Sequence, residues 1–394
     1  LRKVERSSSL GSFSYEIVDT KLSRNTKAGT ILQLCLYSDL LSEIQDLWPE
    51  NMYVVPPWTN FNPEVFRADN YAAYYRLVKK SLENEIAAPM EDSYPDPKEQ
   101  CDFCRWRLQC EQRRRKDDHL CFVAGISNLQ ITELRRNGIA TLSELASMPL
   151  PLSWKPERGA VETYERLREQ ARIQHEGREK EKPIYEVLTP EPGYGLANLP
   201  QPSPGDIFFD LEGDPFVGES GMEYLFGYTL LGENGEMKYH NVWALNREDE
   251  RAAFECFVDF VFECWQQYPD LHIYHFGHYE PSTLKRLMGR YASREDQIDR
   301  LLRASLFVDL HSIVRRSIRA SVESYSIKKL EQLYNFERTL SLDKANQALA
   351  VLQSALEVGD PESVPSKDKK SIATYNRDDC LSTAALRSWL EKIR

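Results

Sequence analysis

Three short acidic segments lie far apart in the C-terminal half of the sequence. Asp210 and Glu212 stand two residues apart, Glu280 follows a second apolar stretch, and Asp379 belongs to a third segment. Each carboxylate falls where an apolar strand ends or a helix begins. Hard cations such as Mg²⁺ and Mn²⁺ prefer oxygen ligands, so carboxylates gathered from distant points suit them. Two such ions can stabilise the attacking and the leaving oxygen of a phosphodiester, which makes hydrolysis of that bond the expected chemistry.

Local spacing decides whether these side chains share a surface. On a strand, Asp210 and Glu212 point to the same side, whereas in a turn near Gly213 both would be solvated. Tyr375 and Asp379 are four apart on an expected helix and share one face, where the phenol could orient a water molecule. The alternative there is a buried Tyr beside an exposed Asp.

Glu280 precedes Pro281 and therefore suits the first turn of a helix. An acid at that position is also favoured simply by the helix dipole. The surrounding elements predict an α/β domain with a mixed sheet, because strands and helices alternate over 206–394. We expect strands at 207–211, 224–230, 238–244 and 272–275. We expect helices at 249–265, 281–291, 297–304, 327–334 and 369–391.

Together the three segments resemble the DEDD exonucleases of the ribonuclease H-like superfamily, in the branch whose last motif contains Tyr. The resemblance implies two divalent ions, Mg²⁺ or Mn²⁺, held by Asp210, Glu212, Glu280 and Asp379. It also implies that Tyr375 positions the attacking water. Glu280 stands where the family usually has Asp, and Asp309 is a spare acid that could fill that role.

A second candidate site lies in the N-terminal part, where strands are expected at 1–5 and 15–19 and helices at 27–44 and 63–85. Asp19 and Lys21 are followed by Gln33 and Tyr37, four apart on the first helix. The acid could hold a metal and the ammonium could stabilise charge on phosphate. The set resembles the RecB-type, PD-(D/E)XK nucleases of the restriction-endonuclease-like superfamily. That family uses one more Asp, expected just before Leu1, so this chain should begin inside that domain.

Three cysteines form a compact group in the sequence: Cys101, Cys104 and Cys110. Thiolates suit an iron–sulfur cluster or zinc. Several RecB-like nucleases close their domain with such a trio around a [4Fe–4S] cluster, completed by a fourth cysteine from the start of the domain. The alternatives are a zinc site with Cys121 or His119 as fourth ligand, or three cysteines without a ligand.

The order of these parts resembles RecB-family nucleases fused to a YprB-like exonuclease domain, some of which continue into a helicase. We expect five parts: a C-terminal portion of a restriction-endonuclease-like α/β domain (1–97), the cysteine group (98–118), helices similar to helix-hairpin-helix modules (119–175), a Pro-rich linker (176–205) and a ribonuclease H-like domain (206–394). Within the helical part, one longer helix is expected over 155–174.

Composition describes an ordinary folded protein, with 41% hydrophobic and 28% charged residues and a net charge of −11. No apolar run approaches the roughly 20 residues that span a bilayer, so no membrane partner is expected. The first residues are charged and not Met, which predicts a fragment or processed form without a secretory signal. The eight cysteines do not form a secreted disulfide framework, which favours a cytoplasmic location.

These observations predict a metal-dependent nuclease, by resemblance a 3′→5′ exonuclease on single-stranded DNA ends in repair or mobile-element defence. RNA is an equal candidate as substrate, because contacts to the 2′-hydroxyl leave no sequence motif. The alternative function is a nucleic-acid-binding module with degenerate catalysis that serves a helicase or nuclease partner.

Overall fold

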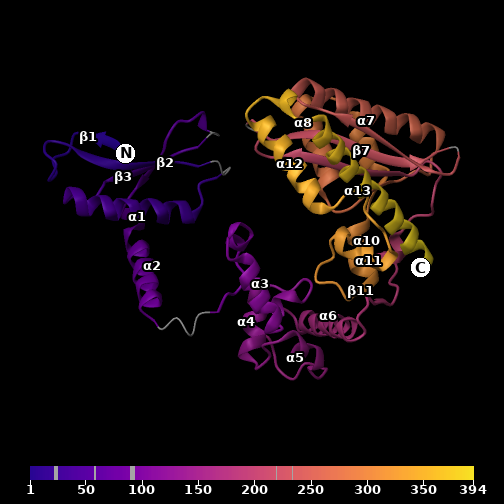
Figure 1. Ribbon diagram of the computed structural model, residues 1–394, viewed down its shortest axis with the longest axis horizontal. Helices are drawn as coiled ribbons and strands as arrows, with labels where there is room; N and C mark the ends of the chain where they lie inside the picture. The colour runs from indigo at the N-terminus through magenta and orange to yellow at the C-terminus, as the bar shows by residue number, and fades with distance from the viewer. Residues whose placement is uncertain (22–24, 57–58, 89–93, 219, 233) are drawn as a thin grey trace. The chain divides into compact units, whose positions relative to one another are not determined.

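The computed structural model describes residues 1–394 except 22–24, 57–58, 89–93, 219 and 233. The chain forms two compact units, Leu1–Asp96 and Pro97–Arg394 (Figure 1). Both units contain helices and strands, and their sheets mix parallel with antiparallel pairs, so the α/β prediction is confirmed.

Unit 1 contains a four-stranded sheet in the order β1-β2-β3-β4. Strands β2 and β3 are parallel, and α1 makes the connection between them. Its core contains Leu34 and Cys35 from the helix and Met52 and Val54 from β3. The elements are β1 (Arg2–Val4), β2 (Ser14–Thr20), α1 (Ala28–Gln45), β3 (Asn51–Val55), β4 (Glu64–Arg67) and α2 (Asp69–Ala87).

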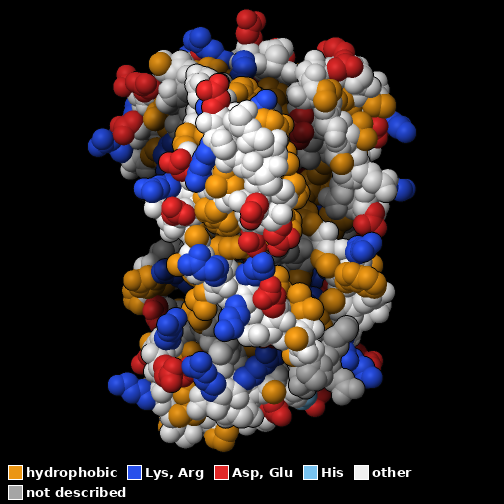
Figure 2. Space-filling model, turned by 90° about the vertical axis from the view of Figure 1, so that its left-hand side faces the viewer, with side chains coloured by type: hydrophobic (Ala, Val, Ile, Leu, Met, Phe, Trp, Pro, Cys, Tyr) orange, Lys and Arg blue, Asp and Glu red, His pale blue; other side chains and the backbone are white. Residues whose placement is uncertain are grey.

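One predicted helix of unit 1 starts too early. The sequence indicated a helix over 63–85, but Glu64–Arg67 pairs antiparallel with β3, and the helix begins at Asp69. Backbone N–H and C=O groups of this segment form hydrogen bonds with β3, and these long-range bonds override the local helical pattern. Large apolar side chains stay exposed on α1 and α2, and Figure 2 shows such side chains scattered between charged ones.

Unit 2 begins with small helices around their own core. Ser127 and Thr141 cap α4 and α5 through reciprocal hydrogen bonds with Gln130 and Glu144, which fixes where these helices start. The core includes Leu120, Leu134, Leu142, Leu145 and Tyr164. The elements are η3 (Glu99–Phe103), α3 (Arg107–Lys116), η4 (Leu120–Phe122), α4 (Asn128–Arg136), α5 (Leu142–Ser147) and α6 (Val161–Glu179). The helix predicted over 155–174 therefore starts and ends later than expected.

The stretch 176–205 holds the end of α6, β5 (Tyr185–Val187) and η5 (Gly195–Asn198). Strand β5 pairs antiparallel with β11 (Ile318–Ala320), which comes from the C-terminal part of the unit. The Gln170 side-chain amide on α6 also donates to the Ala320 carbonyl oxygen, at 2.9 Å. These bonds attach the small helices to the C-terminal part.

A five-stranded sheet in the order β10-β9-β6-β7-β8 forms the centre of the C-terminal part. The β6–β7 and β7–β8 pairs are antiparallel, whereas β6–β9 and β9–β10 are parallel. The strands are β6 (Ile207–Asp214), β7 (Met222–Leu231), β8 (Met237–Trp243), β9 (Ile273–His275) and β10 (Phe307–Asp309). The four strands predicted for this part correspond to β6, β7, β8 and β9, whereas β10 was not predicted.

Alternate residues of β6 belong to two different cores. In Figure 1, helices α7 and α8 lie on one side of the sheet and α12 and α13 on the other. Ile207, Phe209 and Leu211 pack with α7, α8 and α9, whereas Phe208 packs with the end of α13. Asp210 and Glu212 share the parity of Phe208, so both point to the α13 side. The helices are α7 (Arg247–Gln267), α8 (Tyr279–Tyr291), α9 (Glu295–Arg303), α10 (Leu310–Ser317), α11 (Ile327–Tyr334), α12 (Leu342–Glu357) and α13 (Ser366–Ile393), with η6 (Pro361–Ser363) between the last two.

Helix α12 was not predicted from the sequence. It packs on α13 through Leu352, Ala355 and Ile372 and so supports that helix. Among the described helices, none has both the length and the apolar character needed to cross a membrane.

Candidate metal-binding active site

Three carboxylates meet between β6 and α13. Asp210 and Glu212 come from the strand and Asp379 from the helix, and one oxygen of each lies within 4.8 Å of those of the others. Together with Tyr375 and Lys328 they line an open pocket. The spacing rules therefore place four of the predicted side chains in one site: the two strand acids by alternation, and Tyr375 and Asp379 by the helical repeat.

Asp210 is held by Asn376 on α13. The Asn376 side-chain N–H donates to Asp210 Oδ2 at 2.7 Å, and Tyr239 donates its hydroxyl hydrogen to Asn376 Oδ1 at 2.8 Å. Gly227 pairs with Asp210 across β6 and β7, and a Cβ at that glycine would lie 1.5 Å from Asn376 Oδ1. The absence of a side chain at position 227 is therefore what lets Asn376 reach the strand.

Asp379 is held by Arg338, which follows α11. The guanidinium donates to Asp379 Oδ1 at 2.7 Å and to Glu331 Oε1 at 2.6 Å. Ser382 also donates to Glu331 Oε1, at 2.8 Å. One cation shared between two largely buried acids fixes the orientation of Asp379.

Tyr375 faces the same pocket and is paired with Lys328 from α11. The Lys328 ammonium donates to the Tyr375 hydroxyl oxygen and lies 4.7 Å from the ring centre. Burial, followed by the charges of Asp379 and Glu212, raises the pKa of Tyr375 above its ordinary value. Tyr375 therefore remains a phenol whose O–H can donate, while Lys328 occupies an acceptor position of its oxygen.

Glu280 lies in the first turn of α8, as expected, but stands outside the group of three. Its side chain is buried, and Oε2 has no hydrogen-bond donor within the described residues. Nδ1 of His275 lies 3.7 Å from that oxygen, but burial lowers the pKa of His275 and so favours its neutral form. Asp309, the spare acid, instead caps α10: its Oδ1 accepts from the backbone N–H groups of Gly277 and His311, at 2.8 and 2.9 Å.

The carboxylates are crowded, with Asp210 and Glu212 half-buried and Glu280 and Asp379 buried. Burial, then the neighbouring Asp379 and Glu212, raise the pKa of Asp210 well above its ordinary value. Burial and then Asp379 raise the pKa of Glu212 to about 8, although Lys328 acts in the opposite direction. For Glu280, burial is the largest cause of a pKa raised to about 8. An all-oxygen donor set with this unbalanced charge fits a divalent cation, which would favour the ionised forms.

These shifts predict how stability depends on pH. Glu212 and Glu280 have folded-state pKa values of about 8, whereas an unfolded Glu titrates near 4.3. Between these values the folded state binds more protons, so the free energy of unfolding falls as pH rises from about 4.5 to 8. We expect the melting temperature in EDTA to fall by several degrees over this range, since roughly 1 kcal/mol corresponds to 2–4 °C. Added Mn²⁺ should offset the fall, most strongly near pH 8.

Thermal unfolding at pH 5, 6, 7 and 8, with EDTA or Mn²⁺, measures this effect. Glu212→Gln serves as the reference, because it removes one of the titrating groups and should flatten the EDTA profile. A melting temperature in EDTA that stays level or rises with pH in the wild type would contradict the expected linkage.

The side chains singled out in unit 1 form one hydrogen-bonded series. The Lys21 ammonium lies 2.8 Å from Asp19 Oδ2 and donates to Gln33 Oε1 at 2.8 Å. The Gln33 amide in turn donates to the Tyr37 hydroxyl oxygen at 2.7 Å. The end of β2 and one face of α1 thus bring the four predicted residues together. Their assignment to a RecB-type nuclease site stays a prediction.

The cysteines do not form a comparable group. Cys101 lies in η3, Cys104 at its end and Cys110 on α3, and all three are free thiols. Among the residues that the structure describes, the acid set is the one group of three or more ligand side chains with closely spaced donor atoms. Both ring nitrogens of His119 already face partners, the Cys121 N–H at 2.9 Å and the Arg135 guanidinium at 2.6 Å. Iron–sulfur and zinc binding have no support from this arrangement.

Four further residues of the site were not identified from the sequence: Gly227, Lys328, Arg338 and Asn376. Asn376 had an available signal, because it lies three residues before Asp379 and so shares its helical face. Lys328 and Arg338 look like ordinary surface cations in sequence. Gly227 acts through a strand register that no local pattern specifies.

The family comparison agrees with the geometry of the C-terminal part. In the other two comparisons, no curated protein and no solved structure matched the chain. Residues 207–391, which contain the sheet, the acid set and α13, match the family described as the RNase H superfamily, and this similarity suggests a nuclease.

Proposed function

We propose that this protein is a metal-dependent nuclease that removes nucleotides from the 3′ ends of single-stranded DNA. The observation that carries the proposal is the convergence of Asp210, Glu212 and Asp379, whose oxygens lie within 4.8 Å of one another inside the family match. The 3′→5′ polarity, the DNA substrate and a role in repair or defence rest on the resemblance of the motifs to DEDD exonucleases. A helicase partner belongs to the same proposal.

The protein's own residues would prepare the site as follows. Asp210, Glu212 and Asp379 would hold Mg²⁺ or Mn²⁺, which when bound supplies charge stabilisation for the attacking and leaving oxygens. Asn376 and Arg338 keep two of these carboxylates in a fixed orientation before substrate arrives. Such preorganisation avoids rearrangement of the site during the reaction.

Tyr375 and Lys328 would act on the substrate side of the pocket. The phenol O–H can donate to the attacking water or to a phosphate oxygen and orient it. The Lys328 ammonium lies next to that phenol and lines the same pocket, where a positive charge favours the phosphate anion. The raised pKa of Tyr375 makes it an orienting donor and not a proton acceptor.

Binding without hydrolysis is the second candidate function, and the position of Glu280 favours it. That acid stands outside the group of three. A pocket with three carboxylates in place of four would bind a second ion more weakly.

A labelled-strand assay separates the two functions. Single-stranded DNA and RNA of one sequence, labelled at the 5′ end, are incubated with the protein in Mg²⁺, Mn²⁺ or EDTA. The exonuclease proposal predicts stepwise shortening of the 5′-labelled DNA with either metal and none in EDTA. A 3′-labelled strand should release its label as mononucleotide at once. Strands that keep their full length but migrate more slowly in a native gel would instead establish the binding function.

A further inference from the structure

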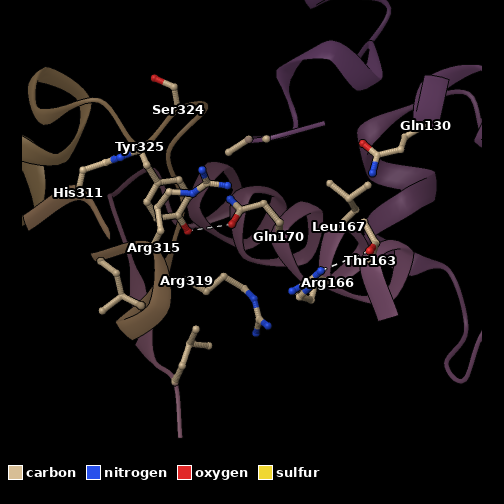
Figure 3. A pocket seen from close by; sticks show the side chains of 14 residues that line it. Gln130, Thr163, Arg166, Leu167, Gln170, His311, Arg315, Arg319, Ser324 and Tyr325 are labelled. Atoms are coloured by element: carbon tan, nitrogen blue, oxygen red, sulfur yellow. Dashed lines mark hydrogen bonds between the residues drawn. The ribbon is translucent and has the colours of Figure 1, made fainter. Parts of the chain in front are cut away.

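A basic hollow lies between the small helices and the C-terminal part of unit 2. Its walls come from the loop before α4, from α6, and from α10, β11 and the segment that follows. The cavity measures about 480 Å³ and opens to solvent. Figure 3 shows Arg166 on α6, with Arg315 and Arg319 on the opposite wall. A second hollow, lined by Arg166, His311, Arg315 and Arg316, adjoins it.

The arginines of this hollow differ in their carboxylate neighbours. Within the described part of the chain, no Asp or Glu lines either hollow, and no acid pairs with Arg166 or Arg315. Arg319 differs, since it contacts Glu169 and Glu186 at 3.4 and 3.3 Å. In a chain with a net charge of −11, a concave surface with unneutralised guanidinium groups selects an anionic partner.

The basic hollow adjoins the carboxylate pocket. Phe276 lines that pocket, and its ring lies 5.2 Å from the ring of His311, which lines the basic hollow. The segment 324–328 makes the same connection, because its first two residues line the basic hollow and its last three line the carboxylate pocket. The two pockets therefore lie next to each other, along one continuous segment of the chain.

Aromatic side chains accompany the cations along this path. Phe276 lines the carboxylate pocket, and His311 and Tyr325 line the basic hollow together with the arginines. A basic groove with aromatic surfaces on which bases stack is the usual arrangement for single-stranded nucleic acid. Guanidinium groups suit phosphodiester oxygens, and neither contact depends on the base sequence.

We propose that the basic hollow binds the sugar–phosphate backbone of the strand whose 3′ end lies in the carboxylate pocket. This inference rests on the proposed function and deepens it. The small helices and the C-terminal part then act as one substrate-binding surface, with Arg166 and Arg315 as phosphate ligands on its two walls.

The double variant Arg166→Ala/Arg315→Ala tests the inference with two substrates. On a single-stranded 20-mer in about 0.1 M salt, kcat/KM should fall roughly 10- to 30-fold. The affinity for a single strand depends on salt concentration as a power law, and each lost phosphate contact lowers its exponent by about 0.7. Thymidine 5′-(p-nitrophenyl phosphate) reaches the carboxylate pocket alone, so its hydrolysis should stay within about twofold by the same argument. Equal losses on both substrates, or no loss on the 20-mer, would overturn the inference.

Binding is measured separately so that the two proposals fail in different ways. Fluorescence anisotropy of a labelled 20-mer in EDTA should show a similar rise in Kd for the double variant and a weaker salt dependence. If the wild type hydrolyses neither substrate, the nuclease proposal fails, and this measurement alone decides the inference. An unchanged Kd overturns it. A further arm adds about 1 mM inorganic phosphate to complexes with a 5-mer and with a 20-mer. If phosphate displaces both strands about equally, the hollow is a site for free phosphate, and the inference is again overturned.

The matched control is Arg251→Ala/Arg303→Ala. It removes the same charge from α7 and α9, where both arginines are exposed and form i,i+4 pairs with Glu255 and Asp299. Such pairs contribute little to stability. This variant should retain wild-type Kd and kcat/KM on the 20-mer within about twofold, since it removes no proposed phosphate contact.

Discussion

Asp210→Asn abolishes nuclease activity and leaves the fold intact: this is the largest effect we expect. The change removes one of the three clustered carboxylates while keeping the shape of the side chain. A metal ion contributes several kcal/mol to charge stabilisation, and each 1.36 kcal/mol corresponds to a factor of ten in rate. The rate on single-stranded DNA in Mn²⁺ should therefore drop on the order of 10³-fold or below detection.

Stability should move in the opposite direction. Asp210 is half-buried next to Glu212 and Asp379, so a neutral side chain relieves repulsion when no metal is bound. We expect a melting temperature in EDTA equal to or above that of the wild type, and a smaller increase on addition of Mn²⁺. Asp296→Asn, on the exposed surface of α9, is the control and should change neither activity nor the response to Mn²⁺. Activity that persists in Asp210→Asn would show that the reaction occurs elsewhere in the chain.

Gly227→Ala should have the second-largest effect, although this residue contacts no substrate. The new Cβ would lie 1.5 Å from Asn376 Oδ1, so the amide has to leave its position. Asp210 then loses the hydrogen bond that orients it. Overpacking of this kind costs about 1–3 kcal/mol of stability. We expect that destabilisation together with a loss of activity of at least about tenfold, because one misplaced carboxylate lowers the rate strongly.

A second substitution separates packing from orientation. In Gly227→Ala/Asn376→Ala the clash disappears, so the free energy of unfolding should recover by more than the sum of the single changes predicts. Activity should stay low, because Asp210 still lacks its partner. Gly289→Ala, on an exposed part of α8 with open space around it, should be neutral or slightly stabilising. Full activity in Gly227→Ala would mean that Asn376 does not orient the site.

The sequence predicted the parts of the site that depend on local periodicity. The two-residue repeat placed Asp210 and Glu212 on one face of β6, and the helical repeat placed Tyr375 and Asp379 on one face of α13. The same patterns located the helix over Ile327–Tyr334 and most of the central strands. These inferences use only the positions of apolar and charged residues along the chain.

The remaining contacts depend on which distant segments pair. The fit between Gly227 and Asn376 requires the register of β6 against β7, and the Arg338–Asp379 pair joins segments 41 residues apart. The helix predicted over 63–85 failed for the same reason, because pairing with β3 converts its start into a strand. Glu280 is the intermediate case: its place in the first turn of α8 was predicted, but its distance from the other acids was not.

Helix α13 restricts which changes of length the chain can accept. Asn376 and Asp379 serve the site, whereas Leu386 and Leu390 belong to the core two to four turns further along the same helix. Adding or deleting one residue between these groups rotates one set by about 100° relative to the other. Neither the carboxylate nor the apolar face could then keep its place. Related sequences should therefore show substitutions but not single-residue insertions between Asp379 and Leu386, whereas the surface turns of the domain are free to vary in length.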